Sequence, residues 1–396
     1  MGRNTTVVDR IRAFNEGRDP DLLKRKYQLM RSSAHAFLRG TAHLFYDELP
    51  RAALLKTAPA AWISGDLHLE NFGTYRGNDR QVYFDLNDFD EGALAPCTWD
   101  LLRLSVSLLL ATRELEARPG VSRDLVNSLL EAYAITLGGG KAGWVKEETA
   151  EGMVRALIDQ VRRRRRSSFL DSRTVVKGGK RRLRLDDKRA ISVSAAARHD
   201  VMHFMRHLAR ERGDRILEPL DVAGRIAGTG SLGLERYVVL VRGHGSPDHN
   251  LLIDLKHEPR SALRPHLRLS QPRWGSESER VARIQERAQA VSPAFLADVR
   301  LREKSFLMKE AQPSADKVQL AASKRGLADL PGLVRTLGGL VASSQLRSSG
   351  RQGSAIADRF IAFGERASWR GELVRLAEEM ADEVEEDWRA FRASSL

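Results

Sequence analysis

The stretch AWISGDLHLENFGTYRGNDRQVYFDLNDFDE, residues 61–91, decides how the rest of the chain is interpreted. It begins inside an apolar run, 58–63, and a polar loop, 64–71, follows. Two short strand-like runs come next, 72–75 and 81–84, with the turn residues Gly-Asn-Asp between them. This pattern predicts a β-hairpin, with one polar loop before it and an acidic segment after it.

The polar loop holds Asp66 and, five residues later, Asn71. Phosphoryl transfer needs a carboxylate to orient or deprotonate the acceptor hydroxyl, and an oxygen ligand for Mg²⁺. The pair could supply both, with Asp66 as catalytic group, His68 beside it, and Asn71 as metal ligand. The simpler alternative is a turn stabilised by Asp and Asn side chains.

The acidic segment places four carboxylates and an asparagine within residues 85–91. Carboxylates at the end of an apolar strand are costly unless they are paired or bind a metal. Hard oxygen ligands suit Mg²⁺ or Mn²⁺. Asp85, Asp88 and Asp90 are therefore candidate metal ligands, and a solvated acidic loop is the alternative.

A third motif, IAGTGSLGLERYVVL at 226–240, has the spacing G-x-G-x-x-G. A β-run follows it, which argues against a dinucleotide-binding turn, where a helix follows. A glycine loop between strands can fold over nucleotide phosphates, and Gly228, Gly230, Ser231 and Gly233 are the candidate contacts. Lys256 ends the next strand-like run, where it could pair with phosphates. A helical glutamate, Glu279 or Glu286, is expected to orient it. An ordinary hairpin is the alternative.

Together these are the parts of a protein-kinase-like site in an unusual order. We expect an α+β, two-lobe, kinase-like fold that is circularly permuted, which is plausible because chain termini often lie close together. The expected regions are a helical lobe with both polar loops, a basic connecting region, a β-rich nucleotide lobe and returning C-terminal helices. Their expected boundaries are 1–150, 151–216, 217–312 and 313–396.

Residues 64–71 resemble the H-G-D-x-H-x-x-N motif of aminoglycoside and choline kinases, with Ser64 in place of the first His. Nearly the whole chain resembles a bacterial family known as domain of unknown function twenty-two fifty-two. Its F-x-R-G, G-D-x-H-x-E-N-F-G, N-D-F-D-E and W-D-L motifs stand at 37–40, 65–73, 87–91 and 99–101. The resemblance implies membership of the protein-kinase-like superfamily.

The same resemblance implies a role for single residues. Asp66 falls on the catalytic Asp and Asn71 on the Mg²⁺-binding Asn. Asp88, with Asp90 as a second carboxylate, matches the metal-binding Asp better than Asp85, which the distance through the hairpin also allows. Ser64 and Arg283 depart from the pattern. These departures keep open a nucleotide-binding pseudokinase or regulatory scaffold without phosphotransfer.

Composition sets wider bounds. The 396 residues include 65 Lys and Arg against 52 Asp and Glu, a formal net charge of +13. Such basicity allows phosphate-bearing ligands, anionic lipid or nucleic acid. Nucleic acid is possible through Arg162–Arg166 and Arg181–Arg184, but it is not favoured, because aromatic residues do not alternate with these runs. No apolar run approaches the ~20 residues that cross a bilayer. The single cysteine, Cys97, fits a reducing cytoplasm.

The function expected from the sequence is an ATP- and Mg²⁺-dependent phosphotransferase, with Mn²⁺ as a possible substitute. Its acceptor is an unidentified hydroxyl on a small molecule or protein. A metallophosphoesterase is a weaker alternative, because that chemistry usually needs several histidine ligands. His68 is the one histidine within the acidic clusters.

Overall fold

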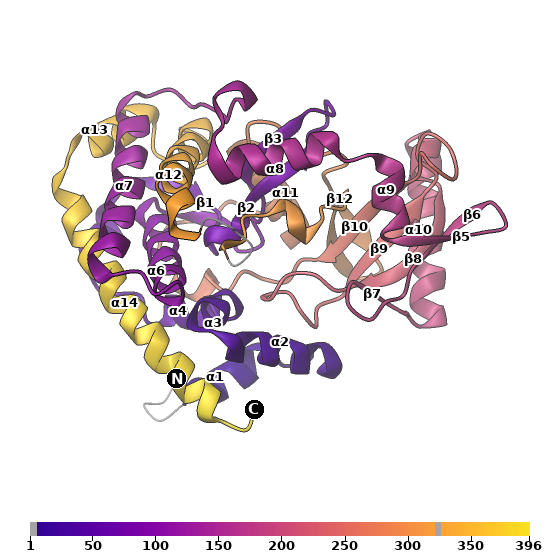
Figure 1. The fold of residues 1–396 in the computed structure, drawn as a ribbon, viewed down its shortest axis with the longest axis horizontal. Coiled ribbons are helices and arrows are strands. Elements are labelled where there is room, and N and C mark those ends of the chain that lie inside the picture. Colours follow the sequence, from indigo (N-terminus) through magenta and orange to yellow (C-terminus); the bar gives the residue numbers. More distant parts are fainter. Residues whose placement is uncertain (1–5, 321–325) are drawn as a thin grey trace.

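The computed structural model describes residues 6–320 and 326–396. The expected α+β class is confirmed: helices gather at one end of the molecule and most strands at the other (Figure 1). The α-helices within these residues are α1 Val7–Phe14, α2 Pro20–Ser32, α3 Ala34–Gly40, α4 Ala42–Asp47, α5 Leu54–Thr57, α6 Thr98–Glu114, α7 Pro119–Gly138, α8 Gly152–Arg163, α9 Arg166–Asp171, α10 Ala195–Glu211, α11 Glu277–Ala288, α12 Leu330–Arg347, α13 Ala357–Glu365 and α14 Ser368–Ala393.

The strands form one large antiparallel sheet and three two-stranded ones. The large sheet has the order β11-β12-β10-β9-β8-β7, and the small sheets pair β1 with β4, β2 with β3, and β5 with β6. The strands are β1 Ala60–Ile63, β2 Phe72–Arg76, β3 Val82–Leu86, β4 Ala93–Pro96, β5 Thr174–Lys177, β6 Lys180–Leu183, β7 Ala190–Ile191, β8 Pro219–Arg225, β9 Arg236–Val241, β10 Leu251–His257, β11 Ala297–Leu301 and β12 Lys304–Glu310.

Helix α6 is the centre of the helical part. Every residue from Thr98 to Thr112 is buried, because α3, α7 and α14 all pack against this helix. A helix with apolar residues on all of its faces must be enclosed by other elements in this way. Within residues 6–320 and 326–396, no helix is long and apolar enough to span a membrane.

The first and last helices of the described residues lie in the helical part. Helices α12 and α13 pack on α7, and α14 packs on α6 (Figure 1). The approach of α12 to α7 is close, since a Cβ on Gly338 would lie 2.2 Å from the carbonyl oxygen of Leu129. Arg31 on α2 donates to the carbonyl oxygens of Phe391 and Ser394, so the two ends of the described chain lie side by side.

The large sheet presents different residues on its two faces, as the alternation of a β-strand requires. Leu251, Ile253 and Leu255 on β10 share an apolar cluster with residues of α10, which covers this face. Alternate residues of the same strand, Asp254 and Lys256 among them, point to the opposite face. That face is the one turned toward the polar loops of the helical part.

Candidate functional site

One cavity collects most of the site residues predicted from the sequence. Its volume is about 730 Å³, and it lies where the helical part meets the large sheet. Its walls come from the α1–α2 link, the loop before β2, the segment after β3 and the loop between β8 and β9. The predicted residues that line it are Asp66, His68, Asn71, Asp88, Asp90, Gly228, Gly230, Ser231 and Gly233.

The glycine loop between β8 and β9 is held by two basic side chains, Arg18 and Lys26. The Arg18 guanidinium donates to the carbonyl oxygens of Gly230 and Leu232 at 2.6 and 3.1 Å, and Lys26 donates to Gly230 at 3.1 Å. Gly233 has φ +88°, and a Cβ there would lie 2.8 Å from Cβ of Arg18. A side chain at this position would therefore be strained and would push the loop away.

The backbone of this loop is suited to anions. Among the residues that the structure describes, the N–H groups of Gly230 and Ser231 donate to no protein atom. The carbonyl oxygen of Gly230 points the other way, toward Arg18 in the α1–α2 link and Lys26 on α2. Free backbone N–H groups in a glycine loop are donors that phosphate oxygens can accept.

Asp66 is fixed by one strong partner. Its Oδ1 accepts from Nε of Arg103 at 2.7 Å and also from Nη2 of the same side chain. Burial raises the pKa of Asp66, and the Arg103 guanidinium opposes that rise. Its Oδ2 has no protein partner among residues 6–320 and 326–396 and is the oxygen available to a ligand in the cavity.

The loop that carries Asp66 is braced by Asp100, at the start of α6. The Asp100 carboxylate accepts the N–H groups of Ser64 and Gly65 at 2.8 and 2.9 Å. Gly65 has φ +82°, and a Cβ there would lie 2.4 Å from the carbonyl oxygen of Glu91. This glycine lets the first polar loop pass directly beside the acidic segment, which places the two groups of side chains in one site.

Asn71 directly precedes β2 and Asp88 follows β3, so both lie at the open end of the hairpin. Both line the same cavity. The Nδ2 of Asn71 donates to the carbonyl oxygen of Asp66 at 2.6 Å, which leaves its Oδ1 as the free acceptor. The Asp88 side chain is about one third exposed, at 34%. Although burial opposes ionisation, Lys256, Lys317 and Lys309 hold the pKa of Asp88 well below its usual range.

Asp85 is the predicted metal ligand that the structure places elsewhere. It is buried, 3.5 Å from a guanidinium nitrogen of Arg347, and it accepts the N–H groups of Leu86 and Ala290 at 2.9 and 3.0 Å. It does not line the cavity. The alternation along β3 turns it toward α11 and α12, where its partners hold the strand in place.

Lys256 does not line the cavity, but it contacts two residues of the acidic segment that do. It is in ion-pair contact with Asp90, and its Nζ is 3.9 Å from Asp88 and 4.0 Å from Glu258. The expectation that Glu279 or Glu286 orients this lysine is wrong. Glu279 accepts the N–H of Gly275 at the start of α11, and Glu286 pairs with Arg283 on the exposed side of that helix.

Glu258 takes the place expected for the helical glutamate. It is 1% exposed, and neither of its carboxylate oxygens has a hydrogen-bond partner among the described residues. Burial raises the pKa of Glu258 to about 7, although Lys256 opposes that rise. Lys256 is thus held between carboxylates from the acidic segment and from its own strand.

The raised pKa of Glu258 predicts a pH-dependent stability. The folded state binds this proton more tightly than the unfolded state, for which the pKa is 4.5. The stabilising effect is complete below pH 4.5 and is lost as the pH rises to about 7. Glu258→Gln is therefore expected to reduce the loss of stability between these pH values by up to about 3 kcal/mol.

Urea unfolding of both proteins at the two ends of this pH range measures the effect. The matched control is Glu286→Gln, which removes a carboxylate from the exposed surface of α11. Its pH dependence is expected to follow the wild type. An unchanged pH dependence in Glu258→Gln would contradict the assignment.

His68 lines the cavity together with Asp66. Its buried Nδ1 has no hydrogen-bond partner in the described part of the chain. Burial lowers the pKa of His68 well below its ordinary value, so the ring is neutral at physiological pH. The loop is braced by other contacts, including the ion pair of Glu70 with Arg39 at 2.6 Å.

The donor set fits a metal that binds together with a phosphate ligand. No group of three or more His, Cys, Asp or Glu suited to a metal ion occurs within residues 6–320 and 326–396. Mg²⁺ in phosphate sites usually takes one or two protein oxygens and completes its shell with water and phosphate. Asn71 Oδ1 and the Asp88 carboxylate offer such a partial set at the cavity wall.

Sequence reasoning missed several residues at this site. Arg103 was visible as the single charge in the apolar run 101–112, which is a signal of a buried partner. Lys309 and Lys317 are cations that act on Asp88, and burial lowers the pKa of Lys317 to about 8. Neither lysine belongs to a motif. The pairing of β12 with β10 places Lys309 near Asp88, and the pairing of Lys317 with Gly73 on β2 places Lys317 there.

The two arginine runs lie away from this cavity. In the first run, Arg162 pairs with Glu147, Arg163 with Asp159 and Arg164 with Asp316. In the second, buried Arg181 pairs with Asp171 and Asp248. Many of these arginines are therefore engaged within the protein.

The fold and the cavity define a mixed α+β protein with a polar site between a helical part and an antiparallel sheet. The chain belongs to the bacterial family described as "uncharacterized protein conserved in bacteria" (DUF2252), whose model matches residues 18–394. No curated protein and no solved structure gave a significant match.

Proposed function

We propose that this protein is an ATP- and Mg²⁺-dependent phosphotransferase that acts on a hydroxyl acceptor. The observation that carries the proposal is the convergence of a glycine loop, Asp66, Asn71 and Asp88 on one cavity. The glycine loop at 228–233 is far along the chain from the other three residues, and each of the four was selected from the sequence for the same chemistry. An ordinary hairpin or a solvated acidic loop has no reason to meet the others.

The roles follow from the atoms that face the cavity. Asp66 Oδ2 is placed to accept the proton of the acceptor hydroxyl, whose oxygen forms the new bond to phosphorus while the bond to the leaving diphosphate breaks. The N–H groups of Gly230 and Ser231 donate to phosphate oxygens. Lys256 adds positive charge, and this preorganised charge stabilises the transition state.

Asn71 and Asp88 would hold Mg²⁺, or Mn²⁺ in its place, together with phosphate oxygens. The ion supplies positive charge that offsets the charge of the transferring phosphoryl group. Since the protein provides few ligands itself, metal binding is expected to require the nucleotide.

We further propose that the fold is a circularly permuted relative of the protein-kinase-like fold. Two features support this. The glycine loop comes after Asp66 and Asp88 in the chain but lines the same cavity, and Lys256 lies 3.9 Å from Asp88. The first and last described helices, α1 and α14, also contact each other, as a permutation that joins old termini and opens new ones requires.

Calorimetric titration of ATP, with and without Mg²⁺, tests the proposed function. The wild type is expected to bind ATP saturably in the presence of Mg²⁺, and Asp88→Ala is expected to weaken that binding by about tenfold or more. Asp79→Ala, on the exposed turn of the same hairpin, is the control for loss of one carboxylate. Mg²⁺ alone is expected to give no saturable heat.

No binding of ATP under either condition would overturn the proposal. Binding without any release of ADP, over a panel of hydroxyl acceptors, would instead establish the alternative of a nucleotide-binding scaffold without phosphotransfer. Equal weakening in Asp88→Ala and Asp79→Ala would remove Asp88 from the site.

A further inference from the structure

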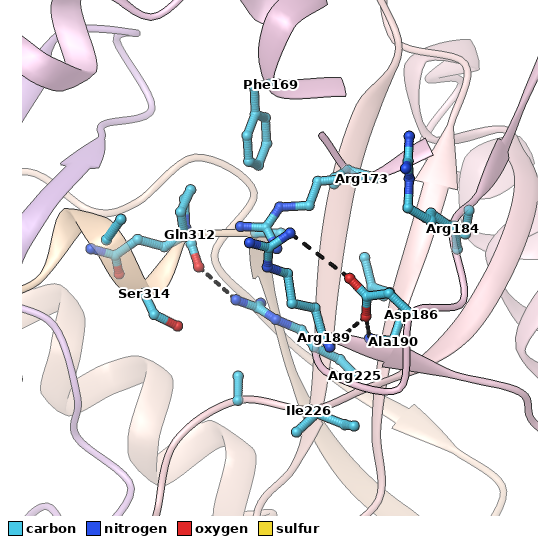
Figure 2. Close-up of a pocket in the computed structure, with 17 residues that line it drawn as sticks. Phe169, Arg173, Arg184, Asp186, Arg189, Ala190, Arg225, Ile226, Gln312 and Ser314 are labelled. Carbon is cyan, nitrogen blue, oxygen red and sulfur yellow. Dashed lines mark hydrogen bonds and ion pairs between the residues drawn. The ribbon is translucent and has the colours of Figure 1, made fainter. Parts of the chain in front are cut away.

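A second cavity lies on the same side of the large sheet and is rich in arginine. Its volume is about 190 Å³, and it shares no lining residue with the cavity that holds Asp66. Figure 2 shows the side chains around it, which come from α9, the segment between β6 and β7, the end of β8 and the segment after β12. Aliphatic side chains form its floor, among them Val238 on β9 and Leu252 on β10.

Three guanidinium groups converge in this cavity. Arg173 and Arg189 reach its centre, and Arg225 approaches from the end of β8 (Figure 2). Arg173 lies over the ring of Phe169, 5.6 Å from its centroid, and has no hydrogen bond or ion pair from its guanidinium to the described residues. Arg189 has one distant ion pair, 3.8 Å from Asp186.

The two nearby carboxylates are already engaged. Asp186 accepts the backbone N–H groups of Lys188, Arg189 and Ala190 at 3.0, 2.7 and 3.3 Å. Asp254 accepts two hydrogen bonds from Arg236 at 2.9 and 2.6 Å, besides its contact with Arg225. The cavity therefore keeps an excess of positive charge. An anion that entered it would reduce the repulsion between the guanidinium groups.

The electrostatics of Arg173 agree with this geometry. Burial lowers the pKa of Arg173, and the neighbouring Arg189 guanidinium lowers it further. Arg225 is also buried against the sheet, and that burial lowers its pKa to about 10. Both remain cations at neutral pH.

We propose that this cavity binds a phosphate group of a small phosphomonoester, held by Arg173, Arg189 and Arg225. Planar guanidinium groups bind tetrahedral oxyanions through paired hydrogen bonds, which a lysine cluster does not provide. The aliphatic floor and the ring of Phe169 give room for a compact apolar body attached to the phosphate. This site is separate from the proposed nucleotide cavity and does not depend on it.

Titration calorimetry with inorganic phosphate and with phenyl phosphate, without nucleotide or Mg²⁺, tests the proposal. Saturable binding is expected for both, and the ring of phenyl phosphate is expected to make it the tighter ligand because it covers the apolar floor. Arg173→Gln combined with Arg189→Gln is expected to weaken binding by about tenfold or more. Arg189 is exposed and Arg173 is half-buried, so the variant is expected to fold.

Two control variants locate the site. Arg184→Gln removes an arginine that lines the same cavity but donates to the carbonyl oxygens of Asp171 and Thr174 (Figure 2). Lys317→Met removes a cation of the other cavity. Both are expected to bind phosphate as the wild type does.

Three results would overturn the proposal: no saturable binding by the wild type, an equal loss in Arg184→Gln, or a loss in Lys317→Met in place of the double variant. Tighter binding of inorganic phosphate than of phenyl phosphate would identify the free ion as the ligand and reject the ester. Because no nucleotide is present, these results are independent of those for the proposed phosphotransferase.

Discussion

The Asp66→Asn variant is expected to bind ATP with Mg²⁺ nearly as the wild type does and to transfer phosphate about 10²–10⁴-fold more slowly. The amide preserves the size of the side chain. It cannot accept a proton, however, so the oxygen that faces the cavity loses its role. Transfer is measured as release of ADP, with acceptor hydroxyls present or with water as the only acceptor. Calorimetry measures ATP binding.

The control for this variant is Glu91→Gln, which changes a second buried carboxylate beside the cavity. Glu91 lines the cavity, and its carboxylate accepts the N–H of Ala262. The Glu91→Gln variant is expected to reduce ADP release far less than Asp66→Asn does. Undiminished ADP release by Asp66→Asn would exclude Asp66 as the base.

Lys256→Met is expected to lower the free energy of unfolding by about 3 kcal/mol, because it leaves buried Glu258 and the partly exposed Asp88 and Asp90 without their cation. Lys256 is only 6% exposed and contacts Asp90, with Asp88 and Glu258 close by. The same change removes the cation that contacts Asp88 and Asp90, two residues that line the nucleotide cavity. Affinity for ATP with Mg²⁺ is therefore expected to fall together with stability.

Urea unfolding and calorimetry measure the two effects of Lys256→Met separately. Lys304→Met is the matched control, since this lysine on β12 forms an ion pair with Glu235 and is about half exposed, at 49%. Its loss is expected to cost less than about 1 kcal/mol, as for other exposed pairs. If both variants unfold at the same urea concentration as the wild type, Lys256 does not neutralise the acidic segment.

The elements around the cavity were predictable because their signals are local. The runs at 72–75 and 81–84 became β2 and β3, paired in register from Phe72 with Leu86 to Arg76 with Val82. The glycine motif lies between β8 and β9, as the strand-like runs on either side of it indicated. Alternation and turn residues are properties of a few neighbouring residues, so they can be recognised without the rest of the chain.

The contacts between distant elements were not predictable in the same way. Strand β4, which pairs with β1 over residues 93–96, is too short to give a pattern. The prediction that Glu279 or Glu286 lies beside Lys256 failed because it depends on how α11 is oriented against the sheet, and the glutamate near Lys256 is Glu258. The bond from Arg103 to Asp66 depends on the packing of α6 against the first polar loop.

The contacts of Arg18 and Lys26 with the glycine loop have a consequence for dissecting this protein. They tie the first helices of the chain to a loop that lies far along the sequence, between two strands of the large sheet. A fragment cut at the start of the sheet would keep every glycine of the loop but lose the side chains that restrain it. The conformation of the glycine loop therefore depends on both regions of the chain. A fragment that lacks the first helices is expected to have a more mobile glycine loop than the full chain.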